Sequence, residues 1–117
     1  MNETVHYMTL LKHPFLEVKS GRKTVEMRLY DEKRRLICPG DKIVFSLADN
    51  IKEKVTAAVI DTYIYESFYE LAASFSAEEL GFAGSTPEAI GDFMMGIYGA
   101  NKTAEYKAFA IKINIQE

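Results

Sequence analysis

The densest group of side chains able to do chemistry is the run Gly-Arg-Lys-Thr-Val-Glu-Met-Arg at residues 21–28. Alternation along a strand places Glu26 and Arg28 on one face, about 7 Å apart, with Lys23 at the start of the strand. A carboxylate beside two cations stays ionised and holds both in place. The guanidinium fits a phosphate or a base edge, while the amine serves as a point charge, or as a nucleophile or base if its pKa is lowered. The run indicates an anion or base site; the alternative is a solvent-facing strand with surface salt bridges, each worth little.

Basic charge is concentrated around this run, although the whole chain carries a net charge of −3. Residues 19–35 hold seven of the 14 Lys and Arg residues, whereas residues 55–101 hold seven acidic residues and no Lys or Arg. A weakly acidic chain with one basic segment favours local anion binding over a general nucleic-acid coat. Gly21 lets the chain reverse into the strand, and Arg22 and Arg35 are expected to widen the positive rim of the site.

Other chemistry-bearing residues give weaker signals. The single cysteine, Cys38, excludes an internal disulfide and a cysteine-based zinc cluster, and we expect an inert thiol. His6 and His13 lack a metal-ligand spacing, and no phosphate-binding glycine loop is present, so neither a metal nor a cofactor is expected. Arg34 and Arg35 fit a solvated turn or a phosphate contact at the rim equally well, and Lys33 fits the solvated turn better. An aromatic cluster could stack a base, but it is more typical of a small-barrel core: Tyr63, Tyr65, Phe68 and Tyr69.

Hydrophobic periodicity predicts the elements that must position the run. Pro14 and Gly21 bound a short helix over 14–20, and capping signatures at Ser67, Ser76 and Thr86 predict a helical region before the last strand. Alternating or β-branched segments predict strands at 4–11, 24–29, 42–47, 53–65 and 109–115. Two helical stripes are expected to face the core: Phe68, Leu71, Ala72 and Phe75 on the first, and Ile90, Phe93, Met94 and Ile97 on the second.

These elements predict an α+β fold that is mainly β. Four or five strands with one or two helices suggest a small antiparallel β-barrel, with the helical insertion covering an end or an open edge. A chain of 117 residues, 48% of them apolar, suits a single domain over 1–117. No apolar run is long enough to span a membrane, and the N-terminus lacks the features of a secretory signal. We therefore expect a cytoplasmic protein without a membrane partner.

The run fits the pattern Gly-x-Lys-x-x-Glu-x-Arg. Together with RLYDEKRR at 28–35 and PGDKIVF at 39–45, it resembles the activating signal cointegrator homology (ASCH) domain, a relative of the PUA domain. The resemblance covers nearly the whole chain. It implies a PUA-like β-barrel with helices at its rim and a cleft that binds RNA or nucleotides. Carried over residue by residue, the family motif places four residues in that cleft: Gly21, Lys23, Glu26 and Arg28.

One branch of the family hydrolyses the acetyl amide of N4-acetylcytidine, and a Lys, a Thr and a Glu are implicated there. The Lys matches Lys23, but the Thr position is Glu26 in this chain, so the proposed nucleophile of that branch is absent. The branch's Glu lies in the helical insertion, where the choices are Glu70, Glu78 and Glu79. The resemblance leaves open whether this chain is an enzyme, either an amidohydrolase or, like other family members, one that cleaves RNA; if it is, Lys23 and Glu26 are the expected catalytic residues.

The leading prediction is a binding module for RNA or a modified nucleotide. Lys23 and Arg28 engage phosphate or base oxygens, and Glu26 orients them or accepts a hydrogen bond from a base amino group such as cytosine N4. One alternative is an amidohydrolase that acts on N4-acetylcytidine-type nucleosides. Another is a protein-interaction module that docks through the acidic helical insertion. The oligomeric state is not specified by the sequence.

Overall fold

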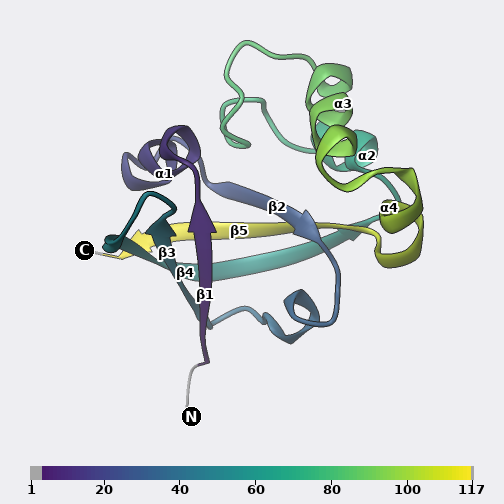
Figure 1. Ribbon diagram of the computed structural model, residues 1–117. Helices are drawn as coiled ribbons and strands as arrows, with labels where there is room; N and C mark the ends of the chain where they lie inside the picture. Colours follow the sequence, from purple (N-terminus) through teal and green to yellow (C-terminus); the bar gives the residue numbers. More distant parts are fainter. Residues whose placement is uncertain (1–3, 117) are drawn as a thin grey trace.

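A five-stranded sheet curls around one side of the molecule, and a group of helices lies beyond one end of its strands (Figure 1). The computed structural model describes residues 4–116. In chain order the elements are β1 (Val5–Leu10), α1 (Lys12–Lys19), β2 (Val25–Leu29), the 3₁₀ turn η1 (Arg34–Leu36), β3 (Lys42–Leu47), β4 (Asn50–Tyr65), α2 (Phe68–Ala73), α3 (Pro87–Tyr98), α4 (Ala100–Tyr106) and β5 (Ala108–Gln116).

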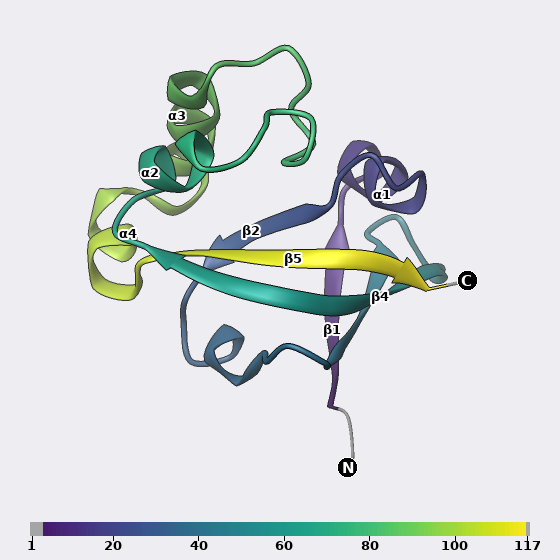
Figure 2. The same ribbon diagram turned by 180° about the vertical axis from the view of Figure 1, so that it is seen from behind.

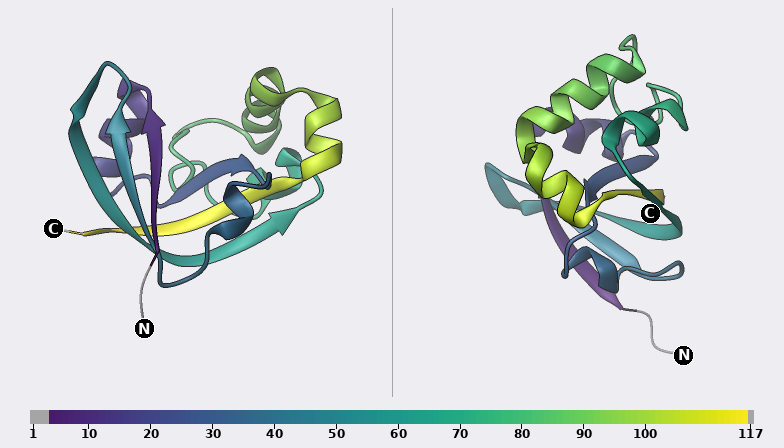
Figure 3. Two further views of the ribbon diagram at one scale, coloured as in Figure 1. Left: turned by 60° about the horizontal axis from the view of Figure 1, so that its bottom comes forward. Right: turned by 90° about the vertical axis from the view of Figure 1, so that its right-hand side faces the viewer.

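The strand order β1-β3-β4-β5-β2 makes β1 and β2 the two edges of the sheet. The β1–β3 pair is parallel and the other three pairs are antiparallel, so the fold is the mainly antiparallel, barrel-like sheet predicted from the strand pattern. The parallel pair arises because α1 and β2 intervene between β1 and β3, and parallel strands need such a crossover. The sheet curls into a half-barrel whose two edges approach each other (Figure 3).

The long strand β4 links the two parts of the sheet. Residues 50–58 pair with β3, and residues 56–65 pair with β5. The register shifts between Val59 and Asp61, which is a bulge, and a bulge bends a strand and increases its twist. The strand starts at Asn50, three residues before the predicted start, because a short hairpin joins it to β3 and extends the pairing to Leu47.

Hydrophobic cores lie on both faces of the sheet, and β5 contributes to each. Phe109, Ile111 and Ile113 face the interior of the half-barrel, whereas Ala108 and Ala110 face the helical insertion, because successive side chains of a strand point to opposite faces. The insertion-side core joins β2 and β5 to the helices: Val25, Met27 and Leu29 of β2 with Phe68, Leu71, Leu80, Ile90 and Met94.

The predicted caps start the helices of the insertion. Ser67 Oγ accepts from Glu70 N at 3.1 Å before α2, and Thr86 Oγ1 accepts from Ala89 N at 3.1 Å before α3. The third signature, at Ser76, forms reciprocal capping bonds with Glu79 but closes a set of turns instead of a helix. From α2, this connection reaches back over β2 toward α1 (Figure 2).

Two helices differ from the prediction. Helix α1 begins at Lys12 instead of residue 14, because Pro14 is tolerated in the first turn, where backbone N–H groups have no helical partner. Helix α4 was not predicted, because its sequence ANKTAEY has no apolar stripe and buries Thr103 alone. No helix within residues 4–116 has the length and apolar character that a membrane crossing requires.

Candidate functional site

The connection between α1 and β2 fixes the start of the motif. Gly21 adopts φ +82°, which favours glycine, and its N–H donates to Val18 O at 3.0 Å after the end of α1. Lys23 N donates to Glu17 O at 3.0 Å. The next two backbone N–H groups both donate to Glu79 O, at 2.9 and 3.0 Å. Helix α1 and the insertion thus hold this segment from two sides.

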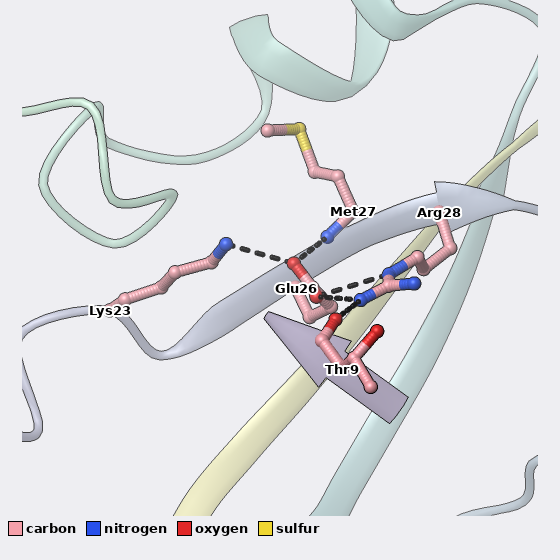
Figure 4. Close-up of polar contacts among 5 residues, drawn as sticks. All are labelled: Thr9, Lys23, Glu26, Met27 and Arg28. Carbon is pink, nitrogen blue, oxygen red and sulfur yellow. Dashed lines mark hydrogen bonds and ion pairs between the residues drawn. The ribbon is translucent and has the colours of Figure 1, made fainter. Parts of the chain in front are cut away.

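A buried ion triad forms the centre of the motif (Figure 4). Lys23 Nζ donates to Glu26 Oε1 at 2.8 Å, while Arg28 Nε and Nη2 donate to Glu26 Oε2 at 3.1 and 3.0 Å. Lys23 is 6% exposed and Glu26 is 3% exposed. The solvent-facing alternative for this strand is therefore wrong: its polar face is covered, and the ion pairs are not ordinary surface pairs.

The carboxylate of Glu26 is fully engaged. Met27 N donates to Oε1 at 3.0 Å, so each carboxylate oxygen accepts two hydrogen bonds, which uses its acceptor capacity. Burial raises the pKa of Glu26, but the charges and hydrogen bonds of Lys23 and Arg28 outweigh burial and lower it to about 2. At neutral pH, Glu26 is a fixed negative charge that orients two cations.

Arg28 also connects the two edges of the half-barrel. Its Nη2 donates to Thr9 O of β1 at 3.1 Å, so a β2 side chain bridges to the backbone of the opposite edge strand (Figure 4). The bonds from Nε and Nη2 leave the Nη1 group, which has no hydrogen-bond partner among residues 4–116. Lys23 Nζ likewise uses one of its three hydrogens on Glu26. Donors therefore remain for a ligand.

Lys23 and Arg28 line a cleft of about 690 Å³, within the size range of small-molecule sites. Its walls come from the end of β1 and the start of α1, from the motif itself, from residues 81–85 of the insertion and from one face of α3. Segments more than 60 residues apart in sequence thus meet here. The three charged motif residues in the cleft are Lys23, Glu26 and Arg28.

An apolar wall stands beside this polar group. The rings of Phe82 and Phe93 lie edge to face with centroids 5.2 Å apart, and Phe93 and Ile97 remain 54% and 56% exposed. The prediction that the whole α3 stripe faces the core is therefore wrong for these two residues. Helical geometry turns Ile90 and Met94 toward the sheet, whereas Phe93 and Ile97 lie beyond its edge and line the cleft.

Gly81 gives the lysine side chain its path. Gly81 adopts φ +83°, and a Cβ there would lie 2.8 Å from Lys23 Cδ and 3.3 Å from its Cγ. Lys23 therefore passes directly over a backbone that has no side chain to obstruct it. Gly81, 58 residues after Lys23 in the sequence, thus leaves the space that the Lys23 side chain occupies.

The remaining predicted site residues lie outside the cleft lining. Gly21 is exposed in the turn after α1. Arg22 is exposed and pairs with Glu17, its Nε and Nη2 donating to Oε2 at 2.9 and 2.6 Å. Arg35 donates to Tyr30 O at 3.1 Å and stacks over the Tyr30 ring, 5.1 Å from its centroid. Arg22 thus lies beside the rim, because it pairs with Glu17, which lines the cleft. Arg35 instead lies against Tyr30.

The carboxylates at the cleft differ from those expected in the insertion. Glu70, Glu78 and Glu79 do not line it, whereas Glu17 of α1 does. The hydrogen bond from Arg22 lowers the pKa of Glu17. His13 lines the cleft as well, four residues before Glu17 and so on the same face of α1. That spacing was a usable signal, because α1 runs directly into the motif.

The other candidates serve the packing. Tyr63 and Tyr65 contact the Phe75 ring at centroid distances of 5.6 and 6.4 Å, so the core interpretation of the aromatic cluster holds for them, and none of its four members lines the cleft. His6 Nε2 lies 2.9 Å from Asp41 Oδ2 in the N-terminal part of the sheet. Cys38 is exposed. Within residues 4–116, no three His, Cys, Asp or Glu residues gather as a metal site.

The half-barrel sheet with a helical insertion over β2 and β5 is a PUA-like fold. The sequence profile of the ASCH domain matches residues 8–117, and the chain belongs to this family of PUA-like domains, which is associated with RNA binding. No significant match is found among curated proteins.

Two solved structures share the fold over almost the whole chain. The crystal structure of the hypothetical protein PH0355 is 29% identical, with a TM-score of 0.85, and the match covers 97% of this chain and 100% of that one. The solution structure of protein PF0455 from Pyrococcus furiosus is 30% identical, with a TM-score of 0.73, covering 97% and 99%. Each match therefore extends over almost the whole of both chains.

Proposed function

We propose that the cleft binds a single nucleotide, either free or as an unstacked residue of RNA. The base lies against the apolar wall of Phe82, Phe93 and Ile97, and its acceptor atoms or a phosphate oxygen receive hydrogen bonds from Lys23 Nζ and Arg28 Nη1. Bases present a flat apolar surface and a polar edge, and the cleft offers an apolar wall beside a group of charged donors.

One observation carries this proposal: the saturation of Glu26. With four hydrogen bonds on its two oxygens, the carboxylate has no acceptor position left for a base amino group. Glu26 therefore orients the cations, and the interaction with cytosine N4 considered for it is not part of the proposal. The remaining donors select ligands rich in acceptors, such as base carbonyls, ring nitrogens and phosphates.

The same observation disfavours Glu26 as a general base. A carboxylate with a pKa of about 2 holds protons weakly at neutral pH, and an effective base has a pKa near the working pH. A binding function is therefore favoured over a hydrolytic one for this cleft. N4-acetylcytidine still belongs among the test ligands, since product analysis separates binding from turnover.

Isothermal titration calorimetry at low salt tests the proposal. The ligands are the four ribonucleoside monophosphates and N4-acetylcytidine, each followed by chromatography for cytidine release. We expect at least one of them to bind, and both Lys23→Met and Phe93→Ala to weaken it about tenfold, the loss of about 1.4 kcal/mol expected for one charge-assisted hydrogen bond or one stacking contact.

Lys19→Met is the matched control. Lys19 belongs to the same basic segment, but its Nζ forms an exposed pair with Glu53 at 3.4 Å, so its replacement leaves binding unchanged. The proposal fails if none of the ligands binds at millimolar concentration, or if Lys19→Met and Lys23→Met weaken binding equally. Phe93→Ala is informative about binding because the ring is largely exposed and contributes little to the core.

A further inference from the structure

A second, smaller pocket adjoins the cleft on the far side of Arg28. Its volume is about 210 Å³, and Thr9 and Arg28 line both cavities. The rest of its lining includes Tyr7 of β1 and Lys33 and Arg34 of the segment after β2. The hydrogen bond from Arg28 to Thr9 O thus forms a short divide between two neighbouring recesses.

Three cationic side chains line the second pocket. They belong to Arg28, Lys33 and Arg34, and no acidic residue is among the lining residues in the described part of the chain. Arg34 is held in position by Asp31, which accepts from its Nη1 at 2.8 Å and from its backbone N at 3.1 Å. Arg34 Nε is buried and has no hydrogen-bond partner within residues 4–116. A buried donor without a partner is costly to the fold.

We propose that this second pocket is a phosphate subsite for the nucleotide next to the one in the cleft. The inference rests on the proposed function and extends it: the ligand is single-stranded RNA of at least two nucleotides, whose backbone crosses Arg28. Lys33 and Arg34 donate to the phosphate oxygens, and such contacts position a strand without reading its sequence.

Two further observations support a strand over an isolated anion. Arg28 lines both cavities, so the base and the phosphate bind to one side chain and lie within a nucleotide's reach of each other. Tyr7 is exposed at the second pocket and offers a ring on which the next base stacks. A base in the cleft must leave its stack, which a single strand permits and a duplex resists.

The test compares Arg34→Gln with Arg35→Gln, two neighbouring arginines that differ in location. Arg34 lines the pocket, whereas Arg35 lies over Tyr30. Lys33→Gln is the second pocket variant, because Lys33 is exposed and its replacement leaves the fold intact. The probes are fluorescein-labelled tetranucleotides of each base, followed by anisotropy between 20 and 200 mM salt, and the unlabelled nucleosides, followed by calorimetry.

We expect Arg34→Gln and Lys33→Gln each to weaken tetranucleotide binding about fivefold and to reduce the slope of log affinity against log salt by about 0.7, the value for one lost single-strand phosphate contact. Nucleoside affinity changes less than about twofold, and Arg35→Gln changes neither affinity. The subsite is refuted, while the proposed function stands, if Arg34→Gln and Arg35→Gln have equal effects. It is refuted in the same way if neither Arg34→Gln nor Lys33→Gln has an effect. A wild-type protein that binds neither nucleosides nor tetranucleotides overturns the subsite and the proposed function together.

Discussion

Replacing Glu26 with glutamine should destabilise the protein in a pH-dependent way. A carboxyl pKa lowered from 4.5 to about 2 on folding corresponds to on the order of 3 kcal/mol of stability at neutral pH. Because the pKa is lowered, this contribution is fully present above the unfolded pKa of about 4.5 and is lost as the pH falls through about 2. Glu26→Gln removes the charge that balances Lys23 and Arg28, so we expect a loss of about 3 kcal/mol at pH 7.

Urea unfolding, followed by circular dichroism at pH 7, 5, 3.5 and 2.5, measures this loss. The difference in unfolding free energy between the wild type and Glu26→Gln should be largest at pH 7 and 5 and should shrink at pH 3.5 and 2.5. Glu53→Gln is the control, because Glu53 forms a half-exposed pair with Lys19 that is worth about 0.5 kcal/mol. A Glu26→Gln effect as small as that of Glu53→Gln, or one that is constant from pH 7 to 2.5, would refute the reasoning.

Two pairs of glycines give further predictions. Gly81 and Gly84 both have positive φ, but a Cβ at Gly81 would collide with the cleft lysine, whereas one at Gly84 meets nothing within 4 Å; both alanine variants should lose about 1–2 kcal/mol in urea unfolding, and Gly81→Ala alone should also weaken nucleotide binding in calorimetry. Equal binding by the two variants would contradict this. In α3, Gly91→Ala would place a Cβ 2.3 Å from the Tyr69 ring and should lower stability by about 1–3 kcal/mol, whereas Gly96→Ala, with open space around it, should raise stability by up to about 1 kcal/mol. Thermal melts check the opposite signs: a higher melting temperature for Gly91→Ala would show that the ring does not pack there, and a lower one for Gly96→Ala would contradict the open space around Gly96.

The position of the triad explains why a charged group is kept inside the fold. Arg28 donates to the backbone of β1, so the ion triad spans the gap between the two edge strands of the half-barrel. Compared with an apolar replacement of the whole group, a buried ion pair offers little net stability, because desolvation offsets much of the attraction, although removal of one partner alone is costly. Its contribution here is directional: Glu26 holds two cations in fixed positions, and both cations line the cleft.

Local patterns predicted most of the fold. The strand at 42–47 matches β3, and the caps at Ser67 and Thr86 start α2 and α3 as expected. These elements were predictable because alternation, capping and turn residues act within a few positions. Helix α4 was missed because its sequence carries no amphipathic stripe, and a helix of this kind is stabilised by its neighbours more than by its own pattern.

The cleft was predictable in part. Residues 23, 26 and 28 line the cleft, and their role as the ligand-binding residues that the family resemblance implies stays a prediction. Its basic charge predicts Arg35 at the rim, but Arg35 lies in η1 and the structure places it over the Tyr30 ring instead. The helical stripe predicts Phe93 and Ile97 to be core residues, because a stripe shows which side chains share a face but not how far the covering sheet extends.

By itself, the sequence determined the local order of the motif: glycine to end a helix, then a lysine, a glutamate and an arginine spaced along one strand face. Only the tertiary structure decided that this face is buried and that it borders a cleft. The reason is that burial depends on groups distant in sequence. The Thr9 carbonyl, the Glu79 carbonyl and the bare backbone of Gly81 converge on β2, and no pattern within residues 21–28 records their approach.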